Sequence, residues 1–449
     1  MRATLLGHAS YVVEGGGATI FVDPVFFDPF EKTCISCPKR VVHRDKLPRA
    51  NAVFLSHAHR DHFDQQSLET LPRSTPVYVP DDDELRESLH RMGFYKVQVL
   101  SPFEPTRIKD LSVIATFSRD PREYGFVWVD DSAAIWDQVD TIVDQRSCVE
   151  VAKLLERPLD VAIVTYMPLL EYAESWVSED EFPRARYDRL LETALMAKAG
   201  TVIPGSSGER HEADREWLNH RIFPASREKF LADLRDIAPE QKSHVINPGD
   251  TIVVERGKDI VVERSAYADT IAVDTDRVRF DPASSPPPPL VDDNLPGYEE
   301  AHLAQVLGVM IEQQLPLAMR NAMTDTVTGP LRTLWDRRAH LQLEFVTPKA
   351  TLTWHLASWS PPAWKPGAEP KPDYVFRYVA SDVVAYIDRK RADLPRGYHL
   401  RFDNPPTPGE PYRLMALDPA RLHGVDIYWS VDEQYWWSPL LIFTSGVRD

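Results

Sequence analysis

Residues 56–64 read Ser-His-Ala-His-Arg-Asp-His-Phe-Asp, and they follow directly on the apolar run 52–55. In an extended segment, side chains two residues apart project to the same side, so we expect His57 and His59 to bind one ion where a strand ends. Asp61 and His62 follow on a turn and are placed to face a second ion. Imidazole and carboxylate ligands suit zinc, iron or manganese, and the cluster contains no cysteine, which argues against a closed structural zinc site.

The pattern His57-x-His59-x-Asp61-His62 resembles the HxHxDH motif of the metallo-β-lactamase superfamily. The resemblance implies an α/β fold, the αββα sandwich, in which two mixed sheets face each other, helices cover the outside and metal ions lie where strand ends meet. Within the superfamily, the chain is similar to the metallo-β-lactamase-like part of CMP-N-acetylneuraminate hydroxylase and its relatives. The segments that carry the likeness are 6–10, 21–24, 59–62, 67–71, 76–79, 138–141 and 203–208 with His211 behind it.

The same resemblance implies further metal ligands beyond the motif. Typical two-zinc members add a middle histidine, an aspartate that bridges both ions and a late histidine. Asp140 matches the bridging aspartate, with Asp137 as the alternative. No histidine stands at the middle position, where Asp120 or Glu123 is the candidate substitute, and His211 is the candidate for the displaced late histidine. Each substitute also has an ordinary interpretation, as a turn charge or a surface histidine.

Four residues are candidates for catalytic or supporting roles. Asp61 would orient the nucleophile in a hydrolytic reaction. His8 either hydrogen-bonds a metal ligand or is structural. Asp23, before a proline, either orients a metal-binding histidine or caps a turn. Asp137, if it does not bridge the ions, is placed to support a ligand.

The ligand types favour oxidative chemistry. Carboxylates in place of imidazoles favour iron or manganese over zinc, and open positions beside such ligands are what iron-dependent dioxygen activation requires. We therefore expect a metal-dependent oxidoreductase, a di-iron oxygenase that hydroxylates a small organic substrate, with zinc or manganese as alternative cofactors. The related hydroxylase carries a Rieske segment, whose ligands the three cysteines here cannot supply, so electrons would come from a separate donor.

Two other functions remain open at this point. One is a metallo-hydrolase that acts on an ester, lactone, amide or phosphodiester with zinc or another divalent metal. The other is a non-catalytic scaffold that metal stabilises and that binds a partner through its carboxy-terminal domain.

The charge and hydropathy of the chain limit the kinds of partner that it is expected to bind. The net charge of −17 and the pI near 5.3 disfavour nucleic acid, whose binding depends largely on basic groups. No apolar run is long enough to cross a bilayer, no signal peptide is evident and cysteines are few, so we expect a cytoplasmic protein without a membrane partner.

A chain of 449 residues exceeds one ordinary core, so two domains are expected. Consecutive prolines within 282–289 favour a stiff linker. We therefore assign residues 1–280 to the metal-binding domain, 281–290 to the linker, and 291–449 to a smaller α+β domain that caps the substrate or binds a partner.

The first domain should contain a strand over 4–13, and the second a helix over 297–323 interrupted at Pro316. The aromatic carboxy terminus, with Tyr428, Trp429, Tyr435, Trp436 and Trp437, could cap the cleft or form core or domain interface.

Overall fold

The computed structural model describes residues 1–30, 34–117, 122–141, 143–169, 182–272, 279–285, 290–324, 338–388, 390, 397–402 and 426–430. The chain divides into two compact units, of which the first comprises Met1–Leu169 and Phe182–Ser285 and the second contains the described residues from 290 onward. Asp120, residues 286–289 and the aromatic residues 435–437 lie outside the described part of the chain. The roles assigned to the two domains and to the linker stay predictions.

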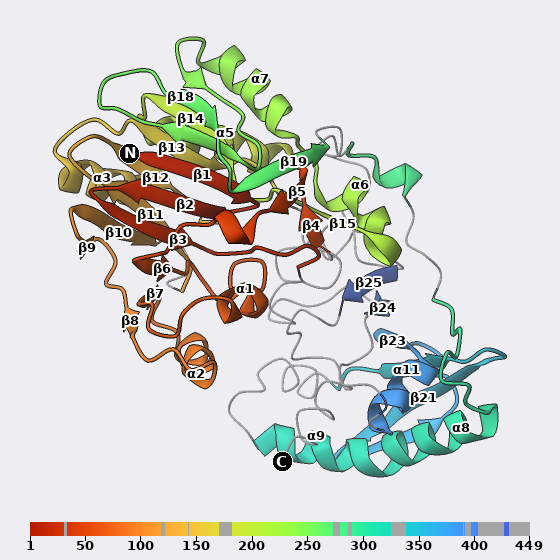
Figure 1. Ribbon diagram of the computed structural model, residues 1–449. Coiled ribbons are helices and arrows are strands. Elements are labelled where there is room, and N and C mark those ends of the chain that lie inside the picture. Colours follow the sequence, from red (N-terminus) through yellow and green to blue (C-terminus); the bar gives the residue numbers. More distant parts are fainter. Residues whose placement is uncertain are drawn as a thin grey trace. The chain divides into compact units, whose positions relative to one another are not determined.

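The first unit contains two large sheets that face each other (Figure 1). In spatial order, the eight-stranded sheet comprises β18 (Val261–Arg264), β17 (Asp250–Val253), β1 (Arg2–Gly7), β2 (Ser10–Gly15), β3 (Ala18–Val22), β6 (Ala52–Phe54), β7 (Val77–Val79) and β8 (Val97–Val99). The seven-stranded sheet comprises β16 (Lys242–Ser243), β14 (Thr201–Gly205), β13 (Val161–Thr165), β12 (Ala134–Asp137), β11 (Tyr124–Val129), β10 (Leu111–Phe117) and β9 (Pro105–Ile108). Two small sheets pair β15 (Glu209–His211) with β4 (Cys34–Ser36) and β19 (Ala268–Ala272) with β5 (Lys39–Val42).

Alternation along the strands builds two apolar layers. Tyr11 and Val13 of β2 point into the layer between the sheets, where they meet Phe126 and Trp128 of β11, whereas Val12 points to the opposite face. This is the period of two expected for a strand buried on both sides. Leu68 of α1 (Gln65–Glu69) and Leu85 and Leu89 of α2 (Asp83–Arg91) cover the outer face of the eight-stranded sheet, where they form one buried apolar cluster with Val12.

Helices complete the sandwich. In addition to α1 and α2, helices α3, α5 and α7 contact strands of the seven-stranded sheet. The described helices of this unit are α1 (Gln65–Glu69), α2 (Asp83–Arg91), α3 (Gln145–Leu155), α5 (Arg184–Met196), α6 (Asn219–Ile222) and α7 (Arg227–Ile237), with short 3-10 turns η1 (Arg44–Lys46), η2 (Ala213–Leu218) and η4 (Pro282–Ser284). The predicted αββα arrangement is confirmed for this unit.

One predicted strand is wrong. The apolar stretch 4–13 is not a single strand, because the chain turns between β1 and β2. Gly7 has a φ of 138° and His8 a φ of 49°, so the backbone leaves the extended conformation at both positions. A Cβ on Gly7 would lie 2.5 Å from the Ser36 Oγ and the Arg40 Nη1 atoms, so only glycine fits there. The turn places His8 at the edge of the sheet.

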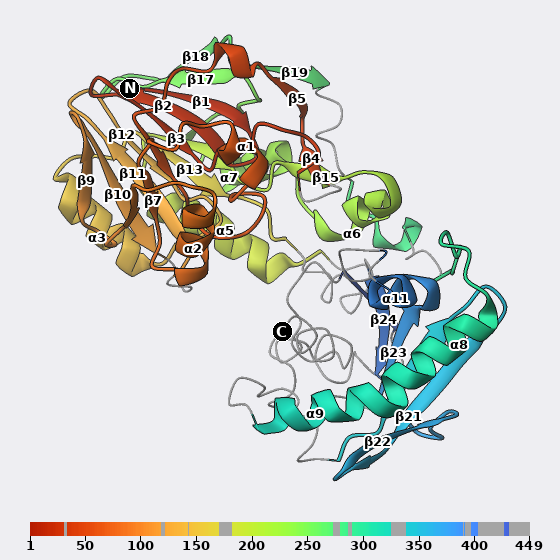
Figure 2. The same ribbon diagram turned by 60° about the horizontal axis from the view of Figure 1, so that its bottom comes forward.

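The second unit is built on one mixed sheet (Figure 2). Its spatial order is β22 (Pro362–Pro366), β21 (Thr351–Trp359), β20 (Leu341–Val346), β23 (Tyr374–Val379), β24 (Gly397–Phe402) and β25 (Asp426–Ser430). The described helical segments are α8 (Glu300–Val309), the π-helical segment η5 (Met310–Gln314), α9 (Leu315–Thr324) and α11 (Ala380–Ile387). Among the described residues of both units, no helix is both long enough and apolar enough to span a bilayer.

The interruption expected at Pro316 is also wrong, because the helical path continues from α8 into α9. Proline lacks the N–H group for the regular i to i−4 bond and its ring crowds the preceding turn. The chain accommodates it with a wider π turn immediately before, in which the Leu315 N–H donates to the Met310 carbonyl.

Candidate metal centre

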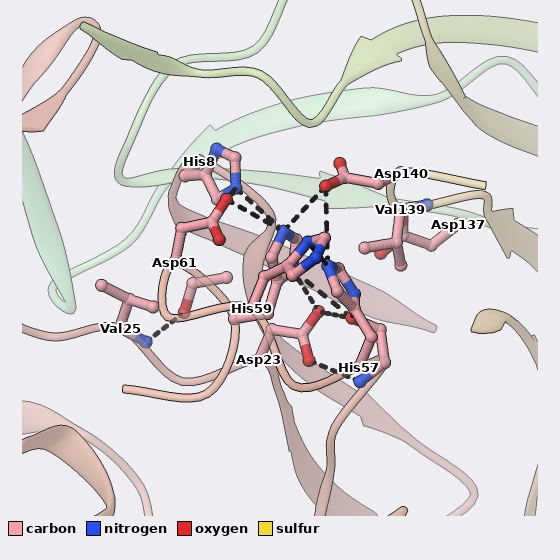
Figure 3. A network of polar contacts seen from close by, with 12 residues as sticks. His8, Asp23, Val25, His57, His59, Asp61, Asp137, Val139 and Asp140 are labelled. Atoms are coloured by element: carbon pink, nitrogen blue, oxygen red, sulfur yellow. Dashed lines mark hydrogen bonds and ion pairs between the residues drawn. The ribbon is translucent and has the colours of Figure 1, made fainter. Parts of the chain in front are cut away.

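Strand direction brings the candidate residues to one edge of the sandwich. β1 and β3 are each antiparallel to β2, and β3 is parallel to β6, so β1, β3 and β6 run in the same direction. Their carboxyl ends therefore lie at the same edge. His8 follows β1, Asp23 follows β3 and the segment 56–62 follows β6, while Asp140 follows β12 in the facing sheet. Figure 3 shows these side chains pointing toward one another.

Four side chains form what we call the donor group, namely His8, Asp61, His62 and Asp140, with one ligand atom from each lying within 4.8 Å of all the others. The His62 Nε2 atom lies 3.0 Å from Asp140 Oδ2, 3.3 Å from Asp61 Oδ2 and 3.2 Å from His8 Nε2. The His8 Nε2 atom lies 3.1 Å from Asp61 Oδ2. Ligand atoms about 2.1 Å from one ion, at angles between about 90° and 109°, are separated by about 3.0–3.4 Å. The donor group fits a single metal ion.

A second cluster adjoins the donor group. The His57 Nε2 atom lies 2.9 Å from His59 Nδ1 and 3.9 Å from Asp140 Oδ2. The same Asp140 oxygen contacts His62, so it lies between the His57 and His59 pair and the donor group. This is the position expected of a carboxylate that bridges two ions, and the described contacts place Asp140 there rather than Asp137.

Asp23 determines how the histidines are oriented. It is fully buried, and its Oδ2 atom lies 2.8 Å from His62 Nδ1 and accepts from the Ser56 hydroxyl at 2.6 Å, while Oδ1 accepts from the Ser56 N–H at 2.8 Å. The Ser56 Oγ atom also lies 2.9 Å from His57 Nδ1. Because the Ser56 proton is directed to Asp23, the Nδ1 atoms of His57 and His62 are the donors in these contacts. In the neutral form of each ring, Nε2 then carries the lone pair on the side of the candidate metal site.

Electrostatics at the donor group favour a cation. Burial disfavours a charged His62 ring, but Asp61 and Asp140 outweigh burial and raise its pKa well above the usual value. Burial would raise the pKa of each aspartate, yet His62 holds the pKa of both Asp61 and Asp140 below the ordinary value. Burial and then the His62 and His59 rings lower the pKa of His57. Two ionised carboxylates thus face imidazole nitrogens, an arrangement that a divalent cation stabilises.

The site is open to small molecules on its acidic side. The side chains of His8, His57 and His62 are 3% exposed or less, whereas those of Asp61 and Asp140 are 15% and 32% exposed. The His59 residue is exposed. The buried imidazoles form the floor, and the carboxylates at the mouth are the groups that a reactant would meet first.

Asp137 is buried beside the loop that carries Asp140. Its Oδ1 atom accepts from the Val139 N–H at 3.1 Å, and the residue is 1% exposed. Burial raises the pKa of this carboxyl to about 8, so the group is largely protonated at neutral pH. Through this hydrogen bond Asp137 supports the loop that carries Asp140. Its contacts therefore indicate a supporting role rather than that of a ligand bridging two ions.

The two remaining ligands predicted within the described residues, His211 and Glu123, are not part of the donor group. His211 is buried on β15, where its Nδ1 atom lies 3.5 Å from the Cys34 Sγ atom and its ring stacks on Phe223, and it is not one of the four residues of the donor group. Glu123 is half-buried and immediately precedes Tyr124, whose N–H donates to the Ser56 carbonyl. Its backbone therefore adjoins the strand end that carries His57, and its role as a ligand stays a prediction, as does that of Asp120.

Sequence reasoning missed Glu209 entirely. Its Oε2 atom lies 3.5 Å from His8 Nδ1, and its side chain is 13% exposed. Burial raises the pKa of Glu209 to about 7, against the opposing effect of His8. The one available signal was position, because Glu209 directly follows the segment 204–208 that stands where the resemblance places the late histidine. His8 was expected only in a supporting or structural role, whereas the structure brings it into the donor group.

Residues 2–139 match the family model of the β-lactamase superfamily domain. The first unit has a metallo-β-lactamase fold. Two mycobacterial proteins, each called "Putative Rieske 2Fe-2S iron-sulfur protein", are also similar to the chain. The one from Mycolicibacterium smegmatis is 28% identical over 99 residues and the one from Mycobacterium tuberculosis strain H37Rv is 26% identical over 100 residues. In both cases the match covers 21% of this chain and 19% of the relative, so the chain spans about a fifth of the length of these relatives.

Solved structures resemble the metallo-β-lactamase-fold unit at low sequence identity. An isothiocyanate hydrolase from Delia radicum gut bacteria has a TM-score of 0.42 and 17% identity, and the match covers 57% of this chain and 100% of that one. CmlA, a diiron β-hydroxylase from Streptomyces venezuelae, has a TM-score of 0.40 and 16% identity, with 59% of this chain and 54% of that one covered. At this level the likeness carries no argument about chemistry.

Proposed function

We propose that the metallo-β-lactamase-fold unit binds two divalent metal ions and uses them in catalysis. One ion would be held by the donor group, and the second by His57, His59 and Asp140, with Asp140 shared between them. The observation that carries this proposal is the 3.0–3.3 Å separation of four donor-atom pairs, which matches the separation of atoms bound to one ion, within a group whose four atoms all lie within 4.8 Å of one another. The Asp23 and Ser56 contacts, which direct the His57 and His62 lone pairs to the same place, support it independently.

We further propose that the ions are iron and that the reaction is the dioxygen-dependent hydroxylation of a small organic substrate. The donor group contains as many carboxylates as imidazoles, and such oxygen-rich ligand sets suit iron and manganese. Two similar proteins carry Rieske iron–sulfur names, which accords with a reaction that draws electrons from an iron–sulfur donor. A separate protein would supply those electrons to this chain. When bound, the iron pair would supply the capacity to activate dioxygen.

The residues of the chain have distinct roles in this reaction. His8, His57 and His62 lie on the buried floor and would hold the ions away from bulk water. Asp61 and Asp140 are partly exposed, and each contacts His62, so they lie between the floor and an incoming substrate. Asp61 is the candidate for orienting a reactant at the exposed side of the site. Asp140 contacts both the donor group and His57, and so joins the two clusters.

A hydrolase remains the second candidate, because two imidazoles and two carboxylates also form a four-coordinate set that zinc accepts. The substrate would then be an ester, lactone, amide or phosphodiester. In this reaction the bound metal would activate water and polarise the scissile group. Asp61, 15% exposed at its side chain, would orient the attacking water.

Metal loading tests the proposal. The full chain is purified without oxygen, stripped with a chelator and reconstituted separately with Fe(II), Zn(II) or Mn(II), and the bound metal is measured by elemental analysis. We expect two equivalents in the wild type and about one equivalent in each variant, because the His57→Ala, His59→Ala double variant and His62→Ala each remove ligands of one proposed site only. His43→Ala is the matched control, because His43 pairs with Asp269 elsewhere in the fold. A wild type that binds no metal, or a His62→Ala variant that binds two ions, would overturn the two-metal proposal.

Turnover then separates the two chemistries. The iron-loaded protein is mixed with a chemical reductant, and dioxygen uptake is compared with that of the iron-loaded His62→Ala variant. The zinc-loaded protein is assayed with chromogenic ester and phosphodiester substrates. Reductant-dependent uptake only in iron-loaded wild type supports oxidation, whereas hydrolysis by the zinc-loaded form without such uptake assigns the protein to the hydrolases.

A further inference from the structure

Glu209 approaches the donor group from outside the two large sheets. It is the first residue of β15, which pairs antiparallel with β4 so that Glu209 lies opposite Ser36. Its side chain is 13% exposed, and its Oε2 atom lies 3.5 Å from the Nδ1 atom of His8. The partly buried carboxylate thus faces the side of the His8 ring that points away from Asp61 and His62.

The backbone is shaped for this approach. Gly208 precedes Glu209, and a Cβ at this position would lie 3.1 Å from the His8 Cα and 3.3 Å from the His8 N atom. Glycine therefore lets β15 pass close to the turn that carries His8. The Gly208 carbonyl also accepts from the Cys37 N–H at 2.8 Å, which holds the strand against the segment after β4. His8 itself has the left-handed φ of 49°, an uncommon conformation for a residue with a side chain.

The arrangement repeats the one at His62. There, a buried carboxylate, Asp23, lies 2.8 Å from Nδ1, and Nε2 faces the donor group. At His8, the partly buried carboxylate of Glu209 lies beside Nδ1, and Nε2 lies 3.2 Å from the His62 Nε2 atom. Each of the two rings therefore has a carboxylate behind it and a ligand atom in front.

We propose that Glu209 is a positioning residue, whose carboxylate accepts a hydrogen bond from the Nδ1–H of His8 and thereby fixes the His8 Nε2 lone pair toward the metal ion. This inference rests on the proposed function, since it requires that the donor group binds metal. Among the described residues, His8 Nδ1 is a buried polar atom with no formed hydrogen bond, and the nearest carboxylate is that of Glu209. A small rotation of either side chain converts the 3.5 Å contact into a hydrogen bond.

The orientation matters because imidazole binds metal through an unprotonated nitrogen. A neutral ring carries its proton on one nitrogen only, so a proton held at Nδ1 leaves Nε2 free for the ion. Partners of this kind behind a ligand typically contribute about 10–100-fold to metal affinity. Glu209 would thus act through His8 and would not itself contact the ion.

A double-mutant cycle tests this role in the full chain. Zn(II) affinity is measured by competition with a chelator for the wild type, Glu209→Gln, His8→Ala and the double variant. Glu212→Gln is the matched control, since Glu212 lies three residues later and pairs with Lys39 at the surface. We expect Glu209→Gln to weaken the affinity of the donor group about tenfold or more, the control to leave it unchanged, and the double variant to bind no more weakly than His8→Ala.

The outcomes are distinct. Unchanged affinity in Glu209→Gln overturns the positioning role, and additive losses in the double variant overturn it too, because Glu209 would then act without His8. Long-range proton–nitrogen NMR of the zinc-loaded wild type provides a second readout, in which a protonated Nδ1 of His8 supports the proposal and a protonated Nε2 overturns it. Thermal unfolding of the metal-free variants identifies any that do not fold. A wild type that binds none of Zn(II), Fe(II) and Mn(II) overturns the proposed function itself, whereas a loaded wild type with an unaffected Glu209→Gln variant overturns only this inference.

Discussion

Asp23→Asn is the sharpest perturbation of the candidate metal centre, because it changes one buried carboxylate that accepts three hydrogen bonds. Ser56 donates to it through its N–H and its hydroxyl, and His62 donates through Nδ1. An asparagine offers one oxygen and one NH₂ group, so it cannot accept on both sides. If the oxygen faces the Ser56 N–H, the NH₂ group faces His62 Nδ1 and drives the ring to the tautomer protonated at Nε2. That proton then lies where the metal ion would bind.

The expected magnitude follows from the contacts. Hydrogen bonds to a charged group contribute about 1.5–3 kcal/mol each, and a buried unsatisfied donor costs about 1–3 kcal/mol. The asparagine keeps part of the network, so we expect the metal-free variant to lose about 2–4 kcal/mol of unfolding free energy. Metal affinity should fall about 10–100-fold, because the substituted group is the hydrogen-bond partner of His62 and, through Ser56, orients His57.

Urea denaturation of the metal-free protein measures the first quantity, and competition with a chelator for Zn(II) measures the second. Asp269→Asn serves as the matched control, because this aspartate is 65% exposed at its side chain and lies outside the donor group. The reasoning would be refuted by an Asp23→Asn variant whose stability lies within about 0.5 kcal/mol of the wild type and whose metal affinity is unchanged.

Three further outcomes are expected. In urea denaturation, Gly7→Ala should destabilise the metal-free protein by about 3 kcal/mol or more, because the added Cβ would clash with buried side chains. Gly17→Ala, which has open space around it, should cost only about 1–2 kcal/mol. Burial raises the folded-state pKa of Asp137 to about 8, above its ordinary value of 3.8, so this group should lower metal-free stability as pH rises between these values, by up to about 1.4 kcal/mol per pH unit. Asp137→Asn should therefore make the fall in stability from pH 5 to 8 less steep in denaturation curves, and an unchanged slope would contradict the prediction. In the second unit, Arg377→Met leaves the partly buried Glu344 without its 2.7 Å partner, and we expect a loss of about 1–2 kcal/mol, which a wild-type denaturation midpoint would contradict.

The parts of the site that sequence predicted are those that depend on local structure. The HxHxDH segment lies on one turn after one strand, so its spacing alone indicates how its side chains project. Asp23 and Asp140 could be found for a similar reason, since each follows a strand that apolar alternation reveals. The likeness to the metallo-β-lactamase superfamily added the sandwich, which no single segment determines.

The parts that sequence missed depend on contacts between distant segments. His8 enters the donor group because Gly7 and His8 leave the extended conformation, whereas the apolar stretch 4–13 read as one strand. Glu209 reaches His8 only because β15 pairs with β4 and Gly208 permits close passage. Neither the pairing nor the close passage leaves a periodic signal in the sequence.

The position of His211 beside Cys34 has a simple geometric cause. His211 lies two residues beyond Glu209 on β15, and two residues of a strand span about 6.6 Å, more than the length of a hydrogen bond or a metal bond. That offset carries His211 to Cys34 and leaves Glu209 beside His8. A histidine motif displaced by a few residues cannot therefore be assumed to supply the same ligand from a new position. Here the displaced position brings a carboxylate behind His8, and the imidazole that completes the donor group comes from the opposite end of the domain sequence.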